Sequence, residues 1–172
     1  MAKGGIISAI HQGSLAEELE LVPGDKIISI NEQELTDIID LSFALADEEI
    51  EMLIEHENGE QEIIAFEKDI DEELGAEFES AVFGKIRQCA NNCYFCFVDQ
   101  VAPNMRDSLY IKDDDYRLSF LYGNFVTMTN MGPRDLERIH RLHLSPLYIS
   151  VHTTNPKLRG EMLRTKRGEL IM

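Results

Sequence analysis

The sequence RQCANNCYFCF at residues 87–97 decides how this chain is interpreted. It holds all three cysteines of the 172-residue protein, Cys89, Cys93 and Cys96, in the spacing C-x3-C-x2-C. Thiolates are soft ligands that suit iron–sulfur clusters or zinc, and close spacing lets one loop surround a metal group. Three cysteines cannot form a complete set of disulfides, so the pattern indicates a metal site in a reducing compartment.

The number of cysteines separates the kinds of metal site. A closed structural zinc site requires four ligands, so with three cysteines the zinc would need a histidine as the fourth. An electron carrier usually has every iron held by protein, which counts against a carrier with three cysteines. A [4Fe–4S] cluster on three cysteines leaves one iron open. We therefore predict a cluster on Cys89, Cys93 and Cys96, with structural zinc and unligated core cysteines as the alternatives.

The cysteine motif, with Phe95 directly before the third cysteine, resembles the signature of the radical S-adenosylmethionine (SAM) superfamily. The resemblance implies two cofactors, a [4Fe–4S] cluster and SAM, and an electron donor such as ferredoxin or flavodoxin. It also implies that reduction splits SAM into methionine and a 5′-deoxyadenosyl radical, which abstracts hydrogen from the substrate. Phe95 would border the adenine; packing under the loop is its alternative role.

A narrower resemblance covers nearly the whole chain. Residues 91–100, 112–124 and 144–152 resemble a bacterial family whose members join a PDZ-like N-terminus to a radical SAM barrel and a further C-terminal domain. Its members are described as iron–sulfur oxidoreductases, and the resemblance names no substrate. It implies a radical SAM enzyme. The alternative is a PDZ-like protein-binding module whose cysteine loop holds a structural metal.

The N-terminal part, residues 1–68, is similar to a bacterial-type PDZ domain through GSLA at 13–16 and PGDKIISIN at 23–31. The pattern predicts a helix over 15–21, a second helix capped by Thr36, and strands over 4–10, 26–31, 51–56 and 61–67. Asn58-Gly59 indicates a hairpin. The resemblance implies a peptide or protein ligand between Gly5–Ile7 and the second helix; a module docked on another domain is the alternative.

An acidic segment, residues 69–79, is predicted to link this domain to residues 80–172. Strands over 81–86, 125–129 and 147–151 and helices over 134–143 and 156–164 alternate there, which is typical of a parallel sheet. The fold class is thus α/β: a small PDZ-like α+β domain followed by the first part of a radical SAM (β/α) partial barrel. Such barrels usually have about six units, so we expect a truncated chain without activity of its own.

Polar residues at predicted strand ends are candidates for cofactor binding. Ser150 and His152 share one strand face and are expected to point towards SAM or substrate; a buried, hydrogen-bonded role is the alternative for His152. Relatives carry a Gly-Gly-Glu-like element for the SAM amino group where this chain has Thr-Asn-Met at 129–131. The acids at 113–115 suit a cation or a helix cap, and we favour the cap.

Charge divides the chain at the same place. Residues 1–79 carry 3 Lys or Arg and 23 Asp or Glu, whereas residues 80–172 carry 13 and 9. Affinity for phosphate backbones comes chiefly from Lys and Arg, so we do not expect nucleic acid as a partner. No apolar run reaches the roughly 18 residues of a membrane span, and the N-terminus lacks a signal-peptide pattern. We therefore expect a cytoplasmic protein without a membrane partner.

Overall fold

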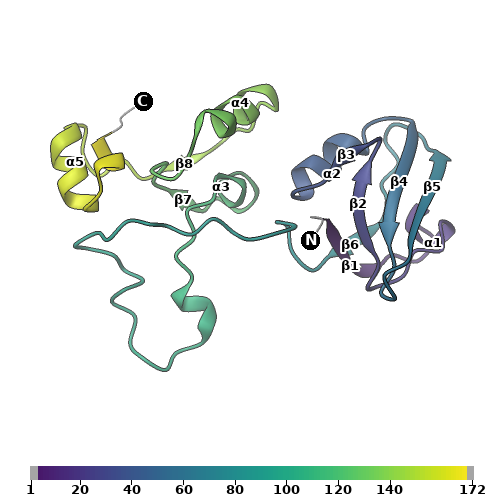
Figure 1. Ribbon diagram of the computed structural model, residues 1–172, viewed down its shortest axis with the longest axis horizontal. Coiled ribbons are helices and arrows are strands. Elements are labelled where there is room, and N and C mark those ends of the chain that lie inside the picture. Colours follow the sequence, from purple (N-terminus) through teal and green to yellow (C-terminus); the bar gives the residue numbers. More distant parts are fainter. Residues whose placement is uncertain (1–3, 170–172) are drawn as a thin grey trace. The chain divides into compact units, whose positions relative to one another are not determined.

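The chain forms two compact units, Met1–Lys85 and Ile86–Met172 (Figure 1). The computed structural model describes residues 4–169. Within that range no helix combines the length and the apolar character needed to cross a membrane.

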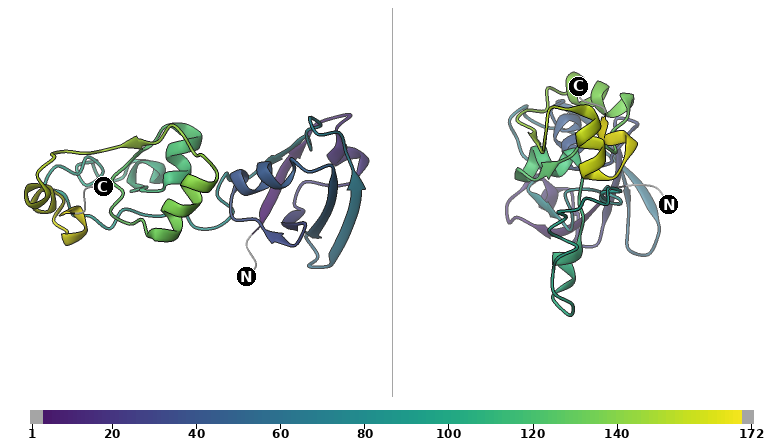
Figure 2. Two further views of the ribbon diagram at one scale, coloured as in Figure 1. Left: turned by 90° about the horizontal axis from the view of Figure 1, so that it is seen from above. Right: turned by 90° about the vertical axis from the view of Figure 1, so that its left-hand side faces the viewer.

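The N-terminal unit is built on an antiparallel sheet in the order β5-β4-β2-β1-β6, with β3 paired to β2 (Figures 1 and 2). Two short helices, α1 (Leu15–Glu18) and α2 (Ile38–Ala44), complete the unit. The strands are β1 (Gly5–Ile10), β2 (Lys26–Ile30), β3 (Gln33–Glu34), β4 (Glu49–Glu55), β5 (Gln61–Glu67) and β6 (Ala76–Phe78).

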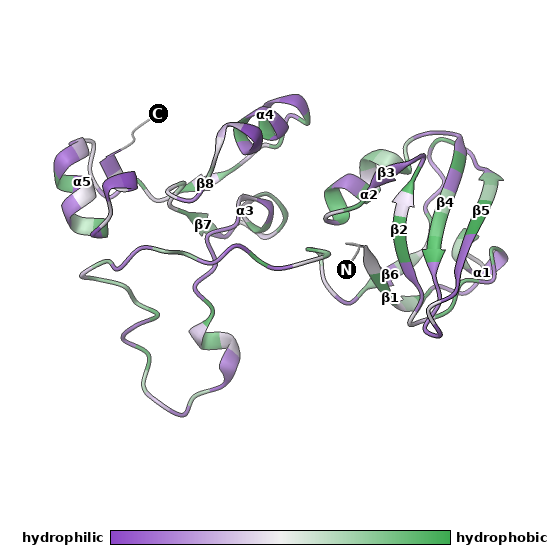
Figure 3. Cartoon of the chain, in the orientation of Figure 1, coloured by the Kyte–Doolittle hydropathy of each residue, from purple (hydrophilic) through white to green (hydrophobic). Residues whose placement is uncertain are grey.

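The core of this unit comes from the inward face of the sheet. Side chains of β4 alternate between buried and more exposed positions, and Figure 3 shows that the strand carries both hydrophobic (green) and hydrophilic (purple) residues. Ile27, Met52 and Ile54 are each at most 1% exposed and belong to one apolar cluster. Because side chains alternate with a period of two, every second one lies on the same face. One face of the sheet is therefore buried and the other faces solvent.

Local signals predicted from the sequence are confirmed in most places. Ser14 caps α1, and the turn at Asn58-Gly59 places Gly59 at φ +87°, a left-handed conformation that glycine adopts freely. The cap of α2 differs from the prediction. Asp37, not Thr36, accepts hydrogen bonds from the first amides of α2, because Thr36 instead donates to the carboxylate of Asp40.

The predicted linker over residues 69–79 is instead part of the N-terminal unit. Its last residues form β6, which pairs antiparallel with β1. Leu74 is buried in the apolar cluster, and its carbonyl accepts a hydrogen bond of 2.8 Å from the amide of Ala16. The acidic side chains that indicated a linker lie mostly on the exposed side, while the backbone between them completes the sheet.

The strand predicted over residues 81–86 does not form. Val82 makes an isolated antiparallel bridge to Asp37, and Phe83 joins the apolar cluster of the N-terminal unit. The apolar side chains that suggested the first strand of a barrel are therefore used by the PDZ-like core.

The C-terminal unit contains a parallel strand–helix–strand element. Strands β7 (Phe125–Val126) and β8 (Tyr148–Ile149) pair in parallel and are connected through α4 (Pro133–Arg141), as the sequence predicts. Parallel neighbours need such a crossover. The other elements are η1 (Asp107–Tyr110), α3 (Tyr116–Tyr122), α5 (Pro156–Leu163) and η2 (Lys166–Glu169). The predicted capping role of the acids at 113–115 is confirmed, because Asp115 caps α3.

Candidate functional site

The three cysteines lie on a long irregular segment that precedes α3, drawn as an open loop in Figure 1. Its two ends are tied together by short backbone hydrogen bonds. The amide of Cys89 donates to the carbonyl of Lys112 (2.7 Å), and the amide of Asp114 donates to the carbonyl of Arg87 (2.9 Å). The first cysteine therefore has a fixed backbone position, although the segment between the ties forms no strand.

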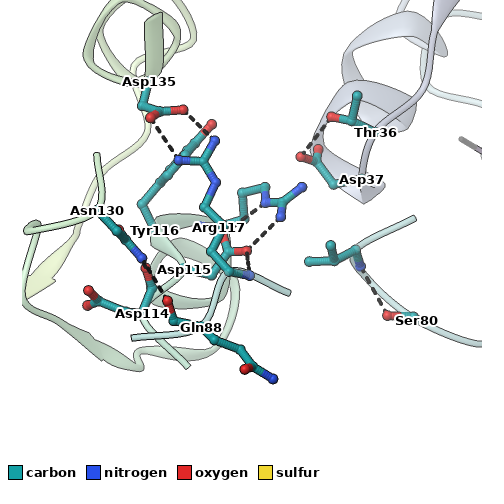
Figure 4. Close-up of polar contacts among 12 residues, drawn as sticks. Thr36, Asp37, Ser80, Gln88, Asp114, Asp115, Tyr116, Arg117, Asn130 and Asp135 are labelled. Atoms are coloured by element: carbon teal, nitrogen blue, oxygen red, sulfur yellow. Dashed lines mark hydrogen bonds and ion pairs between the residues drawn. The ribbon is translucent and has the colours of Figure 1, made fainter. Parts of the chain in front are cut away.

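The buried carboxylate of Asp115 also holds the beginning of the cysteine segment in position. It accepts hydrogen bonds from the backbone amide of Arg87 and from the guanidinium of Arg117, a pair that Figure 4 draws. Burial alone would raise the pKa of Asp115, but these hydrogen bonds outweigh it and lower the pKa. Asp115 is therefore ionised at neutral pH, and it links the cysteine segment to the start of α3.

A buried polar network connects the cysteine loop to the end of β7. The side-chain amide of Asn91 donates to Thr127 (3.1 Å) and its oxygen accepts from Thr129 (3.0 Å). The carboxylate of Asp114 accepts from both the amide and the hydroxyl of Thr127, at 2.6 and 2.7 Å. Asn130, labelled in Figure 4, donates to the carbonyl of Asp114. Asn91 stands between the first two cysteines, so this network orients the loop that carries them.

Arg159 ties the ends of the two parallel strands to each other. This side chain of α5 is 5% exposed, and its guanidinium donates to the carbonyls of Thr127 (2.7 Å) and Ser150 (3.3 Å), which follow β7 and β8. It also donates to the carbonyls of Val151 and Gly168. Five donors on one rigid plane suit this task.

The six residues predicted to bind the cluster, SAM or substrate line one cavity of about 430 Å³. The three cysteines form part of its wall, and the other three are Phe95, Ser150 and His152. The cavity lies where the polypeptide leaves the carboxyl ends of β7 and β8, and Thr127 and Asp114 also face it. Residues more than 60 positions apart in sequence, such as Cys89 and His152, are thus brought to one place.

Phe95 and His152 are in direct contact. Their ring centroids lie 5.2 Å apart with a tilt of 40° between the planes. His152 is an exposed side chain, so the alternative of a buried, hydrogen-bonded histidine is wrong. The surrounding atoms still remove part of the hydration of the imidazole; this loss, and then the charge of Arg159, lower the pKa of His152, which keeps the imidazole neutral at pH 7. It has a left-handed backbone (φ +64°), so the strand alternation expected after Ser150 does not continue through it.

The chemistry of the three thiols suits a metal group. Burial raises the pKa of Cys89 and of Cys93, and the nearby Cys96 raises that of Cys93 further. Thiols in such surroundings give up their protons when a cation binds them. Over residues 4–169, no three His, Cys, Asp or Glu side chains are placed to hold a single metal ion. A four-iron cluster makes a different demand, because each thiolate binds its own iron.

Lys112 is a residue of this site that the sequence analysis did not single out. Its ammonium lies 2.5 Å from the Asp99 carboxylate, and this hydrogen bond, together with the nearby Cys96 and Cys89, raises the pKa of Lys112. A fixed cation beside three thiols offsets part of the negative charge that their ionisation would create. Its place at the closing end of the loop could have indicated this position; Arg159 had no such signal, because an arginine on a surface helix is ordinarily solvated.

The four remaining histidines lie outside this cavity. His140 and His143 face each other at 6.2 Å between ring centroids, beside α4. In the N-terminal unit His11 contacts Glu77, and His56 contacts Asp25 and Glu62. None of these histidines lines the cysteine cavity.

Two models of known families match this chain. Residues 68–172 match the family model described as a Radical SAM-like domain, and residues 6–56 match a PDZ domain. The first match covers more than half of the chain, and the chain belongs to the Radical SAM-like domain family. The predicted order, a PDZ domain followed by a radical SAM-like domain, is confirmed. No curated protein matches the chain significantly.

Proposed function

We propose that the C-terminal unit binds a [4Fe–4S] cluster through Cys89, Cys93 and Cys96 and holds SAM in the adjoining cavity. The observation that supports this is the convergence of the three thiols with Phe95, Ser150 and His152 on one cavity. In open α/β sheets, ligands gather at the carboxyl ends of the strands. The cavity volume, about 430 Å³, also falls within the common range for small-molecule sites.

The side chains around the cavity have distinct tasks in this proposal. Phe95 supplies an apolar surface for the adenine, and its contact with His152 fixes the position of both rings. Ser150 and the neutral His152 offer hydrogen-bonding groups to the rest of SAM or to the substrate. Lys112 offsets the charge of the thiolates.

The cofactors define the class of reaction. When bound, the cluster would supply one electron for cleavage of SAM into methionine and a 5′-deoxyadenosyl radical. The chain's own contribution is to orient SAM and to keep water away from it, which the ring pair and the apolar lining favour. Ferredoxin or flavodoxin is the proposed electron donor, and the reducing cytoplasm, where free thiols persist, is the proposed location.

Anaerobic reconstitution with iron and sulfide tests the proposal. The protein should become brown and bind about four irons per chain. Adding SAM should change the EPR spectrum of the reduced cluster. Each of Cys89→Ala, Cys93→Ala and Cys96→Ala should lose most of the iron. Met105→Ala is the matched control, because Met105 is an exposed side chain of the same loop outside the cavity.

The competing function is a PDZ module with a structural metal. It predicts stoichiometric zinc in anaerobically purified protein, no iron uptake and no response to SAM. That outcome would refute the cluster assignment. If an iron cluster forms but its EPR spectrum does not change when SAM is added, the cluster assignment stands and the SAM site is refuted.

A further inference from the structure

The outer edge of β1 is already paired along its length. Residues 76–78 form β6 and lie antiparallel to β1, with Ile7 opposite Phe78. The pairing extends beyond β6 at both ends. The amide of Glu79 donates to the carbonyl of Ile6 (3.0 Å), and the amide of His11 donates to the carbonyl of Gly75 (2.9 Å). This backbone edge therefore has no room for another strand.

The next residues bind the beginning of α2. The amide of Ile38 donates to the carbonyl of Ala81 (2.9 Å), and the amide of Phe83 donates to the carbonyl of Thr36 (3.0 Å). Val82, between them, is 1% exposed and bridges to Asp37. Figure 4 shows Ser80, which accepts from the amide of Val82, together with Thr36 and Asp37 at the helix start. One segment thus contacts both β1 and α2.

Two aromatic side chains of this segment pack over a glycine of β1. The rings of Phe78 and Phe83 lie 5.4 Å apart over Gly5, and Phe83 is 7% exposed. A Cβ atom on Gly5 would lie 2.6 Å from the ring of Phe83 and 2.8 Å from that of Phe78, closer than packed atoms come. The absence of a side chain at Gly5 is what admits both rings.

PDZ domains bind an extended peptide by adding it as a strand to a sheet edge, with pockets for its side chains. Residues 76–83 hold such an edge, place two aromatic rings over Gly5 and bind the start of the adjoining helix through their backbone. We infer that residues 76–83 are a ligand in cis of this PDZ domain. The domain then serves to anchor the chain just before the cysteine-bearing unit, and a peptide from another protein binds only if this segment leaves.

Tethering favours the internal ligand. A short flexible connection gives a local concentration in the millimolar range, so an external peptide of equal intrinsic affinity competes poorly at micromolar concentration. The Radical SAM-like family match begins at residue 68, so the segment belongs to the sequence of that family while lying in the sheet of the PDZ unit. The inference does not depend on the proposed cofactors.

Hydrogen exchange on the full chain tests the inference directly. The amides of Glu79 and Phe83 should exchange as slowly as those that pair β1 with β2. Phe83→Ala removes a ring, and Gly5→Ala pushes both rings out; each should speed exchange over residues 76–83 at least tenfold. Ile63→Ala, on β5 at the opposite edge of the sheet and 61% exposed, is the control and should change it less than threefold. Exchange of residues 76–83 in the wild type at the rate of an unstructured peptide would overturn the inference.

A peptide competition provides a second measure. A labelled peptide with the sequence of residues 76–84, AEFESAVFG, is titrated with the full chain and followed by fluorescence anisotropy. Phe83→Ala should bind it at least tenfold more tightly than the wild type does, because the site is vacated. The Ile63→Ala control should match the wild type. Binding by the wild type as tight as by Phe83→Ala would mean that the edge is open, which also overturns the inference.

Discussion

The N-terminal unit buries apolar side chains from neighbouring strands, whereas the C-terminal unit buries an unusual share of polar ones. Ile27, Met52 and Ile54 are almost completely enclosed in the first. In the second, Asp114, Asp115 and Arg159 are each at most 5% exposed. Strand pairing also differs, since the first unit has a sheet of six strands and the second, among its described residues, a pair of two-residue strands.

The difference shows how each unit obtains its structure. Apolar packing is non-directional and tolerates changes of shape, so the first unit needs only the correct pattern of hydrophobic residues. Hydrogen bonds are directional, and a buried polar group that loses its partner is costly. The cysteine loop is held by such bonds, so the position of the proposed site depends on a few particular side chains.

The largest effect is expected from Asp115→Ala. This change removes the cap of α3, a partner of the buried Arg117 and an acceptor for the Arg87 amide. Removing one member of a buried ion pair costs about 3–5 kcal/mol. All five tyrosines lie beyond residue 86 and the chain has no tryptophan, so tyrosine fluorescence during urea unfolding reports on the C-terminal unit alone.

The control is Asp107→Ala, an exposed acid in η1 that should leave the tyrosine transition unchanged. A loss of less than 1 kcal/mol in Asp115→Ala would contradict the view that polar contacts hold this unit together. An equal loss in the N-terminal unit would contradict the separation of the two mechanisms.

The apolar core of the first unit gives the next effect. Ile54→Ala should destabilise that unit by about 2–5 kcal/mol, because it leaves a cavity in a packed cluster. Circular dichroism of the six-stranded sheet measures the change, and Ile63→Ala, an exposed residue of the neighbouring β5, should stay within about 0.5 kcal/mol. Equal losses in the two variants would show that burial does not decide stability here.

The sequence allowed the N-terminal unit to be predicted better than the C-terminal unit, because a hydrophobic pattern is local in sequence whereas specific polar contacts are not. The apolar runs of β4 and β5 and the glycine turn between them are visible in a short window of sequence. Parallel pairing of β7 with β8 followed from the helix between them. The errors fell where local pattern and tertiary use disagree: Leu74 and Phe83 were assigned to a linker and to a barrel strand, yet both complete the PDZ-like core.

The candidate site was predicted as a set of residues and not as a geometry. Cysteine spacing and the resemblance named Cys89, Cys93, Cys96 and Phe95, and the predicted strand end named Ser150 and His152. These six residues line one cavity. The contacts that place them were not visible, because hydrogen bonds such as those of Asn91 to Thr127 and Thr129 join residues far apart in sequence. A single sequence carries no signal for such pairs.

Thr127→Val probes that network with a smaller effect. The variant keeps the shape of the side chain but loses the hydroxyl that contacts Asp114, Asn91 and Thr129. A buried hydrogen-bonding group left without its partner costs about 1–3 kcal/mol, so the tyrosine transition should move by that amount. Thr154→Val, an exposed threonine of the same unit, is the control. No difference between the two variants would remove the network from the account of how the loop is held.

The smallest effect is expected from His56, an ionisable side chain beside a buried carboxylate. In the N-terminal unit the imidazole of His56 lies 2.9 Å from Asp25, which is 2% exposed, and 3.3 Å from Glu62. Hydrogen bonds to Asp25 first, and then to Glu62, raise the pKa of His56. A folded-state pKa above the unfolded value of about 6.5 means that the protonated form stabilises the fold. This stabilisation is fully present below about pH 6.5 and is lost as the pH rises through the folded pKa.

Urea unfolding of the sheet between pH 5.5 and 8.5 should therefore show a small decline in the free energy of unfolding as the pH rises. His56→Gln should lack this decline, and His140→Gln, in the other unit, should retain it. If the wild type and His56→Gln give parallel curves, the contact contributes nothing, and the first unit is held by its apolar core alone.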